Sequence, residues 1–539
     1  MAGERPAGPD EYDAVVVGAG FGGMYALHRL RGLGLSVRGF ESGDGPGGTW
    51  YWNRYPGARV DIESMIYSYS FDEQLEQEWE WPEHFSPQPD LERYANHVAD
   101  RFGIRPLVSF GTTVERMTFD EDAGRWHVET NRGDHVVARY VVAATGSLHA
   151  ANYPDLPGRD LFLGEQYHTA RWPRDGVRLA GRRVAVVGTG STGIQVIPLV
   201  AAEAEHLVVL QRTAQFSLPS RNRPMDREYE RSYKANYRTY REMMKKSETA
   251  AVLFGQQFRS VFEVTDDERE SILEDAWNSR SGFRFMGCFS DTRTSLEANT
   301  VIADFVRKKI RQIVRDPVTA EKLCPRGYPI GTKRLCLDTG YFETFNRDNV
   351  DLVDLRSEPI TGLTETGLRT ADREFPLDAI IYATGFDAMT GALTRIEVTG
   401  RGGLRLAEHW REGPRSYLGF VVGGFPNLFM IHGPGSPSVL AQMIMAGEWQ
   451  AEWIAGFIAH LRDSGLNCAD TTTEAEEYWA GEVQAAAERT LYPLADSWYV
   501  GANIAGKPRV FGIYVGGFDK YVAACEAAAV RGYDGFTLS

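Results

Sequence analysis

Two stretches of the chain repeat one pattern of apolar and polar positions. The first has an apolar run at 14–17, a glycine turn, a helical spacing of leucines and a second apolar run at 35–40. The second repeats this order at 183–187, 194–202 and 206–210. Short apolar runs that alternate with a helix are typical of βαβ units. The sequence therefore predicts two similar strand–turn–helix–strand units.

The region after the second unit has a different character. Residues 225–325 are charged and follow helical spacing, and Thr265 stands three residues before Glu268, as in a helix capping box. An apolar helical face is formed by Ile302, Phe305, Val306, Ile310, Ile313 and Val314. We therefore expect a helical insertion within the second unit. No new strand–glycine–helix pattern begins after Tyr417, so the C-terminal part is expected to complete an earlier domain.

Three further apolar segments complete the pattern. The strands at 141–146 and 380–385 both end in Ala-Thr-Gly, and each is a candidate for the strand on which the chain leaves one domain. Residues 417–447 carry no charge apart from a possible one on His432, but glycines and prolines interrupt them repeatedly. A lipid-exposed helix would have to satisfy the backbone groups that these residues free. We interpret this stretch as a buried strand followed by a loop.

Three Gly-x-Gly-x-x-Gly motifs occur along the chain. Two stand between an apolar strand and a helix, where glycines permit a tight turn and the helix N-terminus supplies amide donors for a pyrophosphate. The other, at 43–48, follows a strand but opens no predicted helix, so a flexible loop and a binding role stay equally open. The two strand–helix turns contain Gly18, Gly20 and Gly23, and Gly188, Gly190 and Gly193.

The residue that ends the second strand distinguishes the two units. In the first it is Glu41, whose carboxylate can accept hydrogen bonds from ribose hydroxyls and would repel a 2′-phosphate. In the second it is Arg212, followed by Thr213, and an arginine suits a 2′-phosphate by charge and geometry. One site of each kind implies electron transfer between cofactors, most economically from NADPH to FAD. The chain has no CxxC pair, which disfavours disulfide reductase chemistry.

The fold class that follows is α/β, with two Rossmann-like dinucleotide-binding domains, for FAD and NADP, interleaved in the chain. A helical insertion enlarges the NADP domain. The expected boundaries are 1–148 and 386–539 for the two parts of the FAD domain, 149–224 and 329–385 for the two parts of the NADP domain, and 225–328 for the insertion.

Composition narrows the partners and the compartment. The net charge is −15, from 58 Lys and Arg against 73 Asp and Glu, which disfavours nucleic acid and anionic membranes as partners. The five cysteines are scattered, which fits a reducing compartment and argues against a disulfide framework or a zinc site. The N-terminus has no apolar signal segment. We expect a soluble cytoplasmic protein that is a monomer or a weak homo-oligomer.

A motif between the two units connects the chain to a known family. Residues 162–173, FLGEQYHTARWP, match the pattern FxGxxxHxxxW(P/D). With both glycine turns and both Ala-Thr-Gly strands, the chain from Tyr12 onward resembles the Baeyer–Villiger monooxygenases, which are class B flavoprotein monooxygenases. The segments 331–334 (GTKR) and 433–438 (GPGSPS) are most similar to phenylacetone and steroid monooxygenases, whereas 282–286 (GFRFM) is similar to cyclohexanone monooxygenases. Taken alone, His168 and Trp172 of the motif are not expected to do chemistry.

The resemblance implies a reaction and two catalytic residues. NADPH reduces FAD, O2 adds to the flavin, and a C4a-peroxyflavin anion attacks a cyclic, aromatic or steroid-like ketone to give an ester or lactone. Such an anion needs a fixed cation in a water-poor site. Arg334 matches the family's arginine, and it stays protonated at working pH. Asp61 matches the acid that positions it; a plain surface ion pair is the alternative.

The resemblance also implies a set of cofactor contacts. On the FAD side these are Phe21, Glu41, Thr49, Trp50, Tyr51, Asp61, Tyr67, Val114 and Met443, with Gly18, Gly20 and Gly23. On the NADP side they are Arg59, Gly188, Thr189, Gly190, Ser191, Thr192, Gly193, Gln195, Arg212, Thr213, Lys333, Arg334 and Trp498. Trp498 begins a loop, 498–503, that in the family folds over NADP and the substrate.

Two other functions stay open at this point. A flavin-dependent oxygenase acting on nitrogen or sulfur uses the same cofactors, but it needs no arginine to stabilise an anion. A redox-sensing binding protein would use FAD and NADPH without oxygenation, and no ketone would stimulate its NADPH oxidation. A nucleic-acid binder is disfavoured by the acidic charge.

Overall fold

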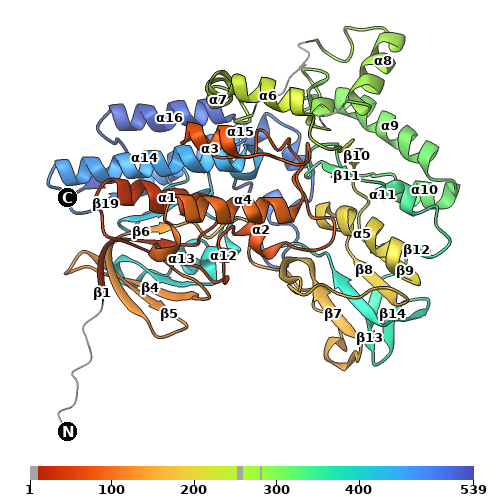
Figure 1. The fold of residues 1–539 in the computed structure, drawn as a ribbon, viewed down its shortest axis with the longest axis horizontal. Coiled ribbons are helices and arrows are strands. Elements are labelled where there is room, and N and C mark those ends of the chain that lie inside the picture. The colour runs from red at the N-terminus through yellow and green to blue at the C-terminus, as the bar shows by residue number, and fades with distance from the viewer. Residues whose placement is uncertain (1–9, 252–258, 280–281) are drawn as a thin grey trace.

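The structure, a computed structural model, describes residues 10–251, 259–279 and 282–539. Two sheets organise these residues, and Figure 1 shows them side by side, with the helices of the insertion along the top and the upper right of the view. The first sheet has eight strands in the order β17-β4-β5-β6-β1-β2-β3, with β18 beside β6. Its strands are β1 (Asp10–Val17), β2 (Val37–Phe40), β3 (Val108–Ser109), β4 (Val114–Asp120), β5 (Arg125–Thr130), β6 (His135–Ala143), β17 (Glu397–Thr399) and β18 (Leu428–Met430).

The second sheet is parallel throughout, in the order β12-β9-β8-β16-β7. Its strands are β7 (Glu165–His168), β8 (Arg183–Val187), β9 (His206–Gln211), β12 (Val350–Asp354) and β16 (Ala379–Tyr382). The chain therefore passes from the first sheet to the second and later returns to the first, so the two sheets are interleaved in the sequence. Both predicted βαβ units are confirmed, with α1 (Phe21–Gly32) and α5 (Ser191–Glu203) as their helices.

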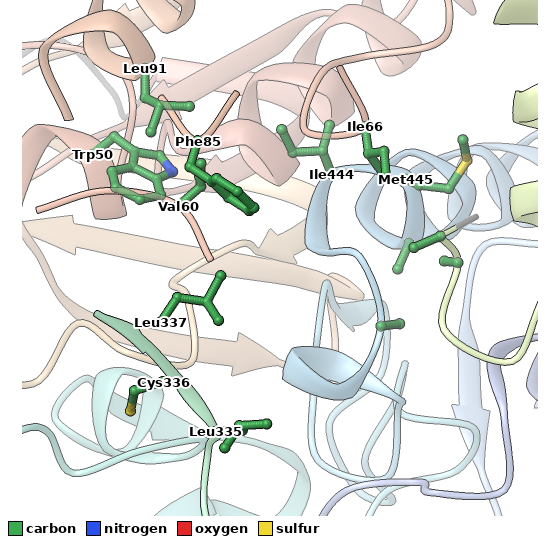
Figure 2. Close-up of a cluster of buried hydrophobic side chains, with 14 of the residues drawn as sticks. Trp50, Val60, Ile66, Phe85, Leu91, Leu335, Cys336, Leu337, Ile444 and Met445 are labelled. Carbon is green, nitrogen blue, oxygen red and sulfur yellow. The ribbon is translucent and has the colours of Figure 1, made fainter. Parts of the chain in front are cut away.

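Both central strands bury both of their faces, which explains their unbroken apolar runs. In β1, Val16 packs into the large central cluster while Val15 packs on the opposite side of the sheet. In β8, Val186 joins the same central cluster and Ala185 faces a third cluster. The central cluster thus joins the two sheets into one core. Figure 2 shows part of it, where Trp50, Leu337 and Ile444 come from three distant segments of the chain.

The Ala-Thr-Gly strands stand directly beside the glycine turns. β6 pairs with β1 and β16 pairs with β8, both in parallel. Gly18 has φ +103°, and a Cβ there would lie 2.5 Å from the carbonyl oxygen of Ala144. Gly188 repeats this geometry, with φ +106° and 2.6 Å to the oxygen of Ala383. Gly18 and Gly188 are therefore required for two reasons: the positive φ, and the close carbonyl oxygen that leaves no room for a side chain.

The glycine motif at 43–48 does open a helix, which the sequence pattern did not predict. The one-turn helix α2 (Thr49–Trp52) begins immediately after Gly48. A Cβ on Gly48 would lie 2.8 Å from the Cα of Gly20, so this loop packs against the first glycine turn. The expectation that this motif opens no helix is therefore wrong. The period of a helix cannot be recognised over a single turn.

The predicted insertion is helical. Its helices are α6 (Arg227–Ala235), α7 (Tyr237–Lys245), α8 (Asp266–Trp277), α9 (Leu296–Ile313) and α10 (Pro317–Leu323). The Thr265 side chain accepts a hydrogen bond from the amide of Glu268 and caps α8 as predicted. The apolar face of α9 is buried. A short parallel pair, β10 (Ser217–Pro219) with β11 (Cys336–Asp338), returns the chain from the insertion to the second unit.

The uncharged stretch 417–447 contains the buried strand β18, a loop and the start of α14 (Met443–Asp463). β18 pairs in parallel with β6, so the C-terminal part completes the first sheet, as predicted. Within the described residues, no helix is both long and apolar enough to cross a membrane. The other elements are α3 (Glu73–Glu78), α4 (Gln88–Arg101), α11 (Tyr341–Thr344), β13 (Ile360–Thr364), β14 (Gly367–Thr370), β15 (Glu374–Pro376), α12 (Gly391–Thr394), α13 (Leu406–His409), β19 (Ala469–Thr471), α15 (Thr473–Glu488), α16 (Phe518–Val530) and β20 (Phe536–Leu538).

Candidate active site

An arginine–aspartate pair lies where three distant segments meet. Arg334 directly precedes Leu335 and β11, and its Nε and Nη2 donate to the two carboxylate oxygens of Asp61, both at 2.8 Å. The two residues are 273 positions apart in the chain. Nη1 of Arg334 also donates to the carbonyl oxygen of Val439, at 3.1 Å. Two parallel bonds fix the plane of the guanidinium as well as its position.

The guanidinium of Arg334 stays protonated. Burial alone would lower the pKa of this guanidinium, but the charge and hydrogen bonds of Asp61 raise its pKa above the usual value. The two side chains are 26% and 29% exposed, so the pair is neither sealed in the core nor free in solvent. The guanidinium is therefore a fixed, partly exposed cation. The pair is thus more than a surface contact.

Aromatic residues predicted on the FAD side gather next to Asp61. Nε1 of Trp50 donates to the hydroxyl of Tyr67, at 3.0 Å. The rings of Phe21 and Tyr67 pack edge to face, with their centres 6.2 Å apart. Burial raises the pKa of Tyr67 to about 12, and the nearby Asp61 contributes in the same direction. Tyr67 is therefore a neutral phenol at physiological pH.

The remaining FAD-side predictions lie in different surroundings. Glu41 is buried and accepts hydrogen bonds from the amides of Ala19 and Gly43, at 2.7 and 2.8 Å, and burial raises its pKa. The hydroxyl of Tyr51 accepts from the amide of Asp44 at 2.8 Å. Both side chains therefore brace the glycine loops. Thr49 opens α2, Met443 opens α14 and Val114 opens β4, and Val114 packs in the apolar cluster with Val17.

Both glycine turns present an uncapped helix N-terminus. Gly20 precedes α1 and Gly190 precedes α5, and neither helix has a capping side chain or an acidic residue in its first turn. A Cβ on Gly190 would meet no atom within 4 Å among the described residues, so open space lies in front of α5. Unbonded amides with a positive helix end attract anions. Both turns therefore fit the pyrophosphate of a dinucleotide.

Side chains of the second turn connect it to the segment that carries Asp61. Gln195 accepts from the hydroxyl of Tyr55 at 2.8 Å and donates to the carbonyl of Arg59 at 3.1 Å. Thr189 donates to the carbonyl of Thr213, at 3.1 Å, and Ser191 lies 3.1 Å from the sulfur of Cys336. Gly193 is buried and Thr192 is half-buried at the start of α5. These bonds set the second unit against the first.

Basic residues gather beyond the second turn. Nζ of Lys333 donates to the carbonyl of Asp496 at 2.7 Å and lies 4.8 Å from the ring centre of Tyr328. Burial lowers the pKa of Lys333, and the charge of Arg212 lowers it further, so these two cations share one neighbourhood. Arg59 points elsewhere, because its guanidinium bonds to Glu83 at 2.8 Å and to the carbonyl of Phe85 at 2.7 Å.

The loop at 498–503 lies near Arg334. Trp498 and Tyr499 lie in a short 3₁₀ helix (Trp498–Val500), with ring centres 4.3 Å apart. Tyr499 is 3% exposed, and burial raises its pKa while the charge of Arg334 opposes that shift. The family resemblance pointed to Trp498 but missed Tyr499, for which the position beside Trp498 is the one signal in the sequence. It also missed Val439, whose contribution is a backbone oxygen.

The motif at 162–173 is structural in this fold. His168 is buried, its Nδ1 accepts from the amide of Ala170 at 3.0 Å, and its Nε2 lies 3.3 Å from the carbonyl oxygen of Asn152. Thr384 donates to the same oxygen at 2.6 Å. Burial lowers the pKa of His168 to about 4, so the ring is neutral. The histidine therefore joins the strand ends of the second unit, and the structure gives it no contact with Arg334.

Comparison with known proteins identifies similar chains over nearly the whole length of this one. Residues 12–252 match the family model of pyridine nucleotide-disulphide oxidoreductases. A Baeyer–Villiger monooxygenase of Pseudooceanicola batsensis is 42% identical over 97% of this chain and 95% of its own, and the phenazine N-monooxygenase PhzNO1 of Lysobacter antibioticus is 42% identical over 98% and 97%. A crystal structure of OTEMO in complex with FAD and NADP has a TM-score of 0.95 at 41% identity, covering 99% of this chain and 100% of its own.

Fold and site together define a flavoprotein oxidoreductase with two dinucleotide-binding units. Within that class, the chain belongs to the family of Baeyer–Villiger monooxygenases. The absence of a CxxC pair separates it from the disulfide reductases that share the broader family model. The resemblance drawn from the motif at 162–173 is thereby confirmed.

Proposed function

We propose that the protein uses NADPH and O2 to convert a ketone into an ester or lactone. One oxygen atom enters the bond beside the carbonyl carbon, the other leaves as water, and NADPH supplies the two electrons. The observation that carries this proposal is the bidentate Arg334–Asp61 pair, standing between two uncapped glycine turns in a chain of this family.

The residues fit both cofactors. The N-terminus of α1 would hold the FAD pyrophosphate, with Phe21, Trp50 and Tyr67 beside the ring system. The N-terminus of α5 would hold the NADP pyrophosphate, with Arg212 and Lys333 at its 2′-phosphate. FAD, when bound and reduced by NADPH, supplies the chemistry that activates O2. The remaining predicted contacts at Thr49, Tyr51, Val114, Met443 and Gln195 belong to this proposal.

Arg334 would stabilise negative charge as it develops on the oxygen being transferred. A fixed cation that is already oriented needs no reorganisation during the reaction, and removing one such donor typically lowers kcat by about 10²–10³. Asp61 holds the guanidinium plane and leaves Arg334 charged at every working pH. Asp61 is therefore a positioning residue, and Arg334 is the catalytic residue.

The loop that carries Trp498 and Tyr499 would exclude water from the site around Arg334. Tyr499 is buried near Arg334, and Trp498, Val439 and Leu440 all pack against the apolar cluster that contains Tyr499. A closed apolar cover strengthens every electrostatic interaction beneath it and limits side reactions with water. We propose that Trp498 contacts NADP and that this cover closes over the ketone.

A heteroatom oxygenase is the second candidate. One relative of this chain, at 42% identity, is named a phenazine N-monooxygenase, so this scaffold is also found with nitrogen oxidation. Transfer of oxygen to nitrogen or sulfur does not require an anion stabilised beside an arginine, so the Arg334–Asp61 pair favours the ketone. A redox sensor without oxygenation is the weakest candidate, because it needs no such pair.

The division of the chain into an FAD domain (1–148 and 386–539), an NADP domain (149–224 and 329–385) and an insertion (225–328) is part of the proposal, as are a cytoplasmic location and a monomeric or weakly oligomeric state. The scattered cysteines support the location. Size-exclusion chromatography with light scattering would test the oligomeric state.

One experiment separates the three candidates. The FAD-loaded protein is incubated aerobically with NADPH and a panel of linear, cyclic, aromatic and steroidal ketones, an amine and a sulfide. An ester or lactone one oxygen heavier than its ketone supports the proposal. N- or S-oxides alone would favour the second candidate, and NADPH oxidation that no substrate stimulates would favour the sensor.

A further inference from the structure

We propose that Arg356 is a third cation for the 2′-phosphate of NADP, beside Arg212 and Lys333. This inference rests on the proposed function, because it assumes that the second unit binds NADP. It adds a residue that neither the glycine motif nor the family motifs point to. Arg356 lies in the loop after β12, far in sequence from both other cations.

Strand register brings Arg356 to the site. β12 pairs in parallel with β9, and Asp354 lies opposite Gln211 at the carboxyl end of both strands. The amide of Leu355 continues the ladder by donating to the carbonyl of Gln211 at 2.8 Å. Arg212 and Arg356 therefore leave the same edge of the sheet, one and two residues beyond that pair. Carboxyl ends of parallel strands are where nucleotides bind in such sheets.

The side chain turns back toward the predicted nucleotide contacts. Nη2 of Arg356 lies 3.5 Å from the hydroxyl oxygen of Thr213, the residue that follows Arg212. Thr213 in turn accepts, through its carbonyl, the hydroxyl of Thr189 in the glycine turn. A short path of contacts thus runs from Arg356 to the start of α5. The Arg356 side chain is exposed, so an incoming phosphate can reach it.

The three cations are not neutralised by neighbouring carboxylates in the part of the chain that the structure describes. Among the described residues, no salt bridge includes Arg212, Lys333 or Arg356. The carboxylate of Asp496 pairs with Arg509 at 3.0 Å, and Asp354 accepts from the backbone amide of Arg356 at 3.1 Å. The pKa of Lys333 is lowered by burial first and then by the charge of Arg212, while Asp496 opposes this shift and Arg356 adds to it. Three mutually repelling cations form a site complementary to a phosphate dianion.

A purely structural role would be different. Arg356 would then only hold Thr213 in place, and the nature of its charge would matter little. Lysine keeps the charge but loses the planar fork that reaches the Thr213 hydroxyl. The Arg356→Lys variant therefore separates the two roles: a phosphate contact tolerates lysine, whereas a brace for Thr213 is lost.

The test measures binding rather than turnover. FAD-loaded protein is titrated calorimetrically with adenosine 2′,5′-bisphosphate and, separately, with ADP, which lacks the 2′-phosphate. For Arg356→Ala we expect an increase of about fivefold in the Kd for the bisphosphate, typical of an exposed charge contact, and no change for ADP. Arg356→Lys should stay within about twofold of the unaltered protein, because the charge is kept.

Two variants serve as references. Arg369→Ala removes another exposed arginine of the second unit, one that pairs with Glu374 at 3.1 Å, and it should leave both affinities unchanged. Arg212→Ala should weaken bisphosphate binding more than Arg356→Ala does. Unchanged bisphosphate binding in Arg356→Ala, with a loss in Arg212→Ala, would overturn this inference alone. Unchanged binding in both variants would overturn the proposed NADP site together with it.

Discussion

The two nucleotide-binding units share a backbone and differ at one strand end. Gly18 and Gly188 have nearly the same positive φ and the same close approach to a neighbouring Ala-Thr-Gly strand. Yet Glu41 is buried and bonded to two backbone amides, whereas Arg212 is exposed beside other cations. On the proposed function, the backbone would set where a pyrophosphate binds, and the strand-end residue would set which nucleotide is accepted.

This difference also separates structure from recognition. Glu41 braces its own turn through Ala19 and Gly43, so its loss should disturb the fold as well as the cofactor. Arg212 braces nothing that the structure describes, so its loss should affect recognition alone. The Arg334–Asp61 pair belongs to neither turn, since it joins two segments that are 273 positions apart and lie outside both glycine motifs. Substitutions at Glu41, Arg212 and Arg334 should therefore impair different properties: folding and FAD binding, nucleotide recognition, and catalysis.

The largest effect is expected at the position outside both turns. Arg334→Ala should still allow NADPH to reduce FAD but should lower ester formation by about 10²–10³-fold or more, because it removes the fixed cation. Anaerobic stopped-flow absorbance measures the first step and product analysis the second. Arg334→Lys, which keeps a charge but not the fork to Asp61, is the matched control. Ester formation at a near-normal rate in Arg334→Ala would refute the assigned role.

The second-largest effect is expected at Glu41, whose carboxylate holds the first glycine turn. Glu41→Ala leaves the amides of Ala19 and Gly43 without their acceptor, which should cost about 3 kcal/mol of folding free energy and release FAD. Flavin content after gel filtration and thermal unfolding measure the two losses. The Arg212→Ala variant, measured in parallel, should keep its FAD. A Glu41→Ala protein with full flavin content and unchanged Tm would show that the carboxylate does not brace the turn.

Recognition of the 2′-phosphate gives the third effect. Arg212→Ala should raise the KM for NADPH far more than the KM for NADH, by about 2 kcal/mol or more, because a charge-assisted contact is lost. Steady-state kinetics with both coenzymes measure the difference. Equal changes for NADPH and NADH would mean that Arg212 does not recognise the phosphate, and the contrast between the two strand ends would then lose its meaning.

The smallest effect concerns an arginine whose charge is already paired. Arg59 bonds to Glu83 and to the carbonyl of Phe85, so Arg59→Ala should change the KM for NADPH by only about twofold. The same kinetic assay measures it beside Arg212→Ala. An effect as large as that of Arg212→Ala would show that Arg59 leaves Glu83 when NADP binds, and the direct contact predicted from the family would then be supported.

Much of the fold could be predicted because its signals are local. Apolar runs, glycine turns and the capping residue Thr265 each act over a few neighbours, and all of these elements form as expected. The one-turn helix α2 could not be recognised, because four residues carry no measurable period. The pairing of β18 with β6 was expected only in outline, since register depends on contacts made across the whole chain.

The site was predictable only in part, for a different reason. Periodicity says nothing about two residues 273 positions apart, so the Arg334–Asp61 pair came from family resemblance rather than from spacing. The Val439 carbonyl leaves no mark on the sequence, because any residue carries one. Arg356 approaches Thr213 through strand register, which no motif records. Long-range geometry is what the structure adds.

The most direct test of the central claim follows the oxygen atom. The FAD-loaded protein is supplied with NADPH, ¹⁸O2 and the ketone that the panel shows to be turned over fastest, and the product is examined by mass spectrometry. The account predicts an ester or lactone that carries one labelled oxygen, formed together with NADP. NADPH consumption without an oxygenated product from any ketone, or an ester without label, would contradict it.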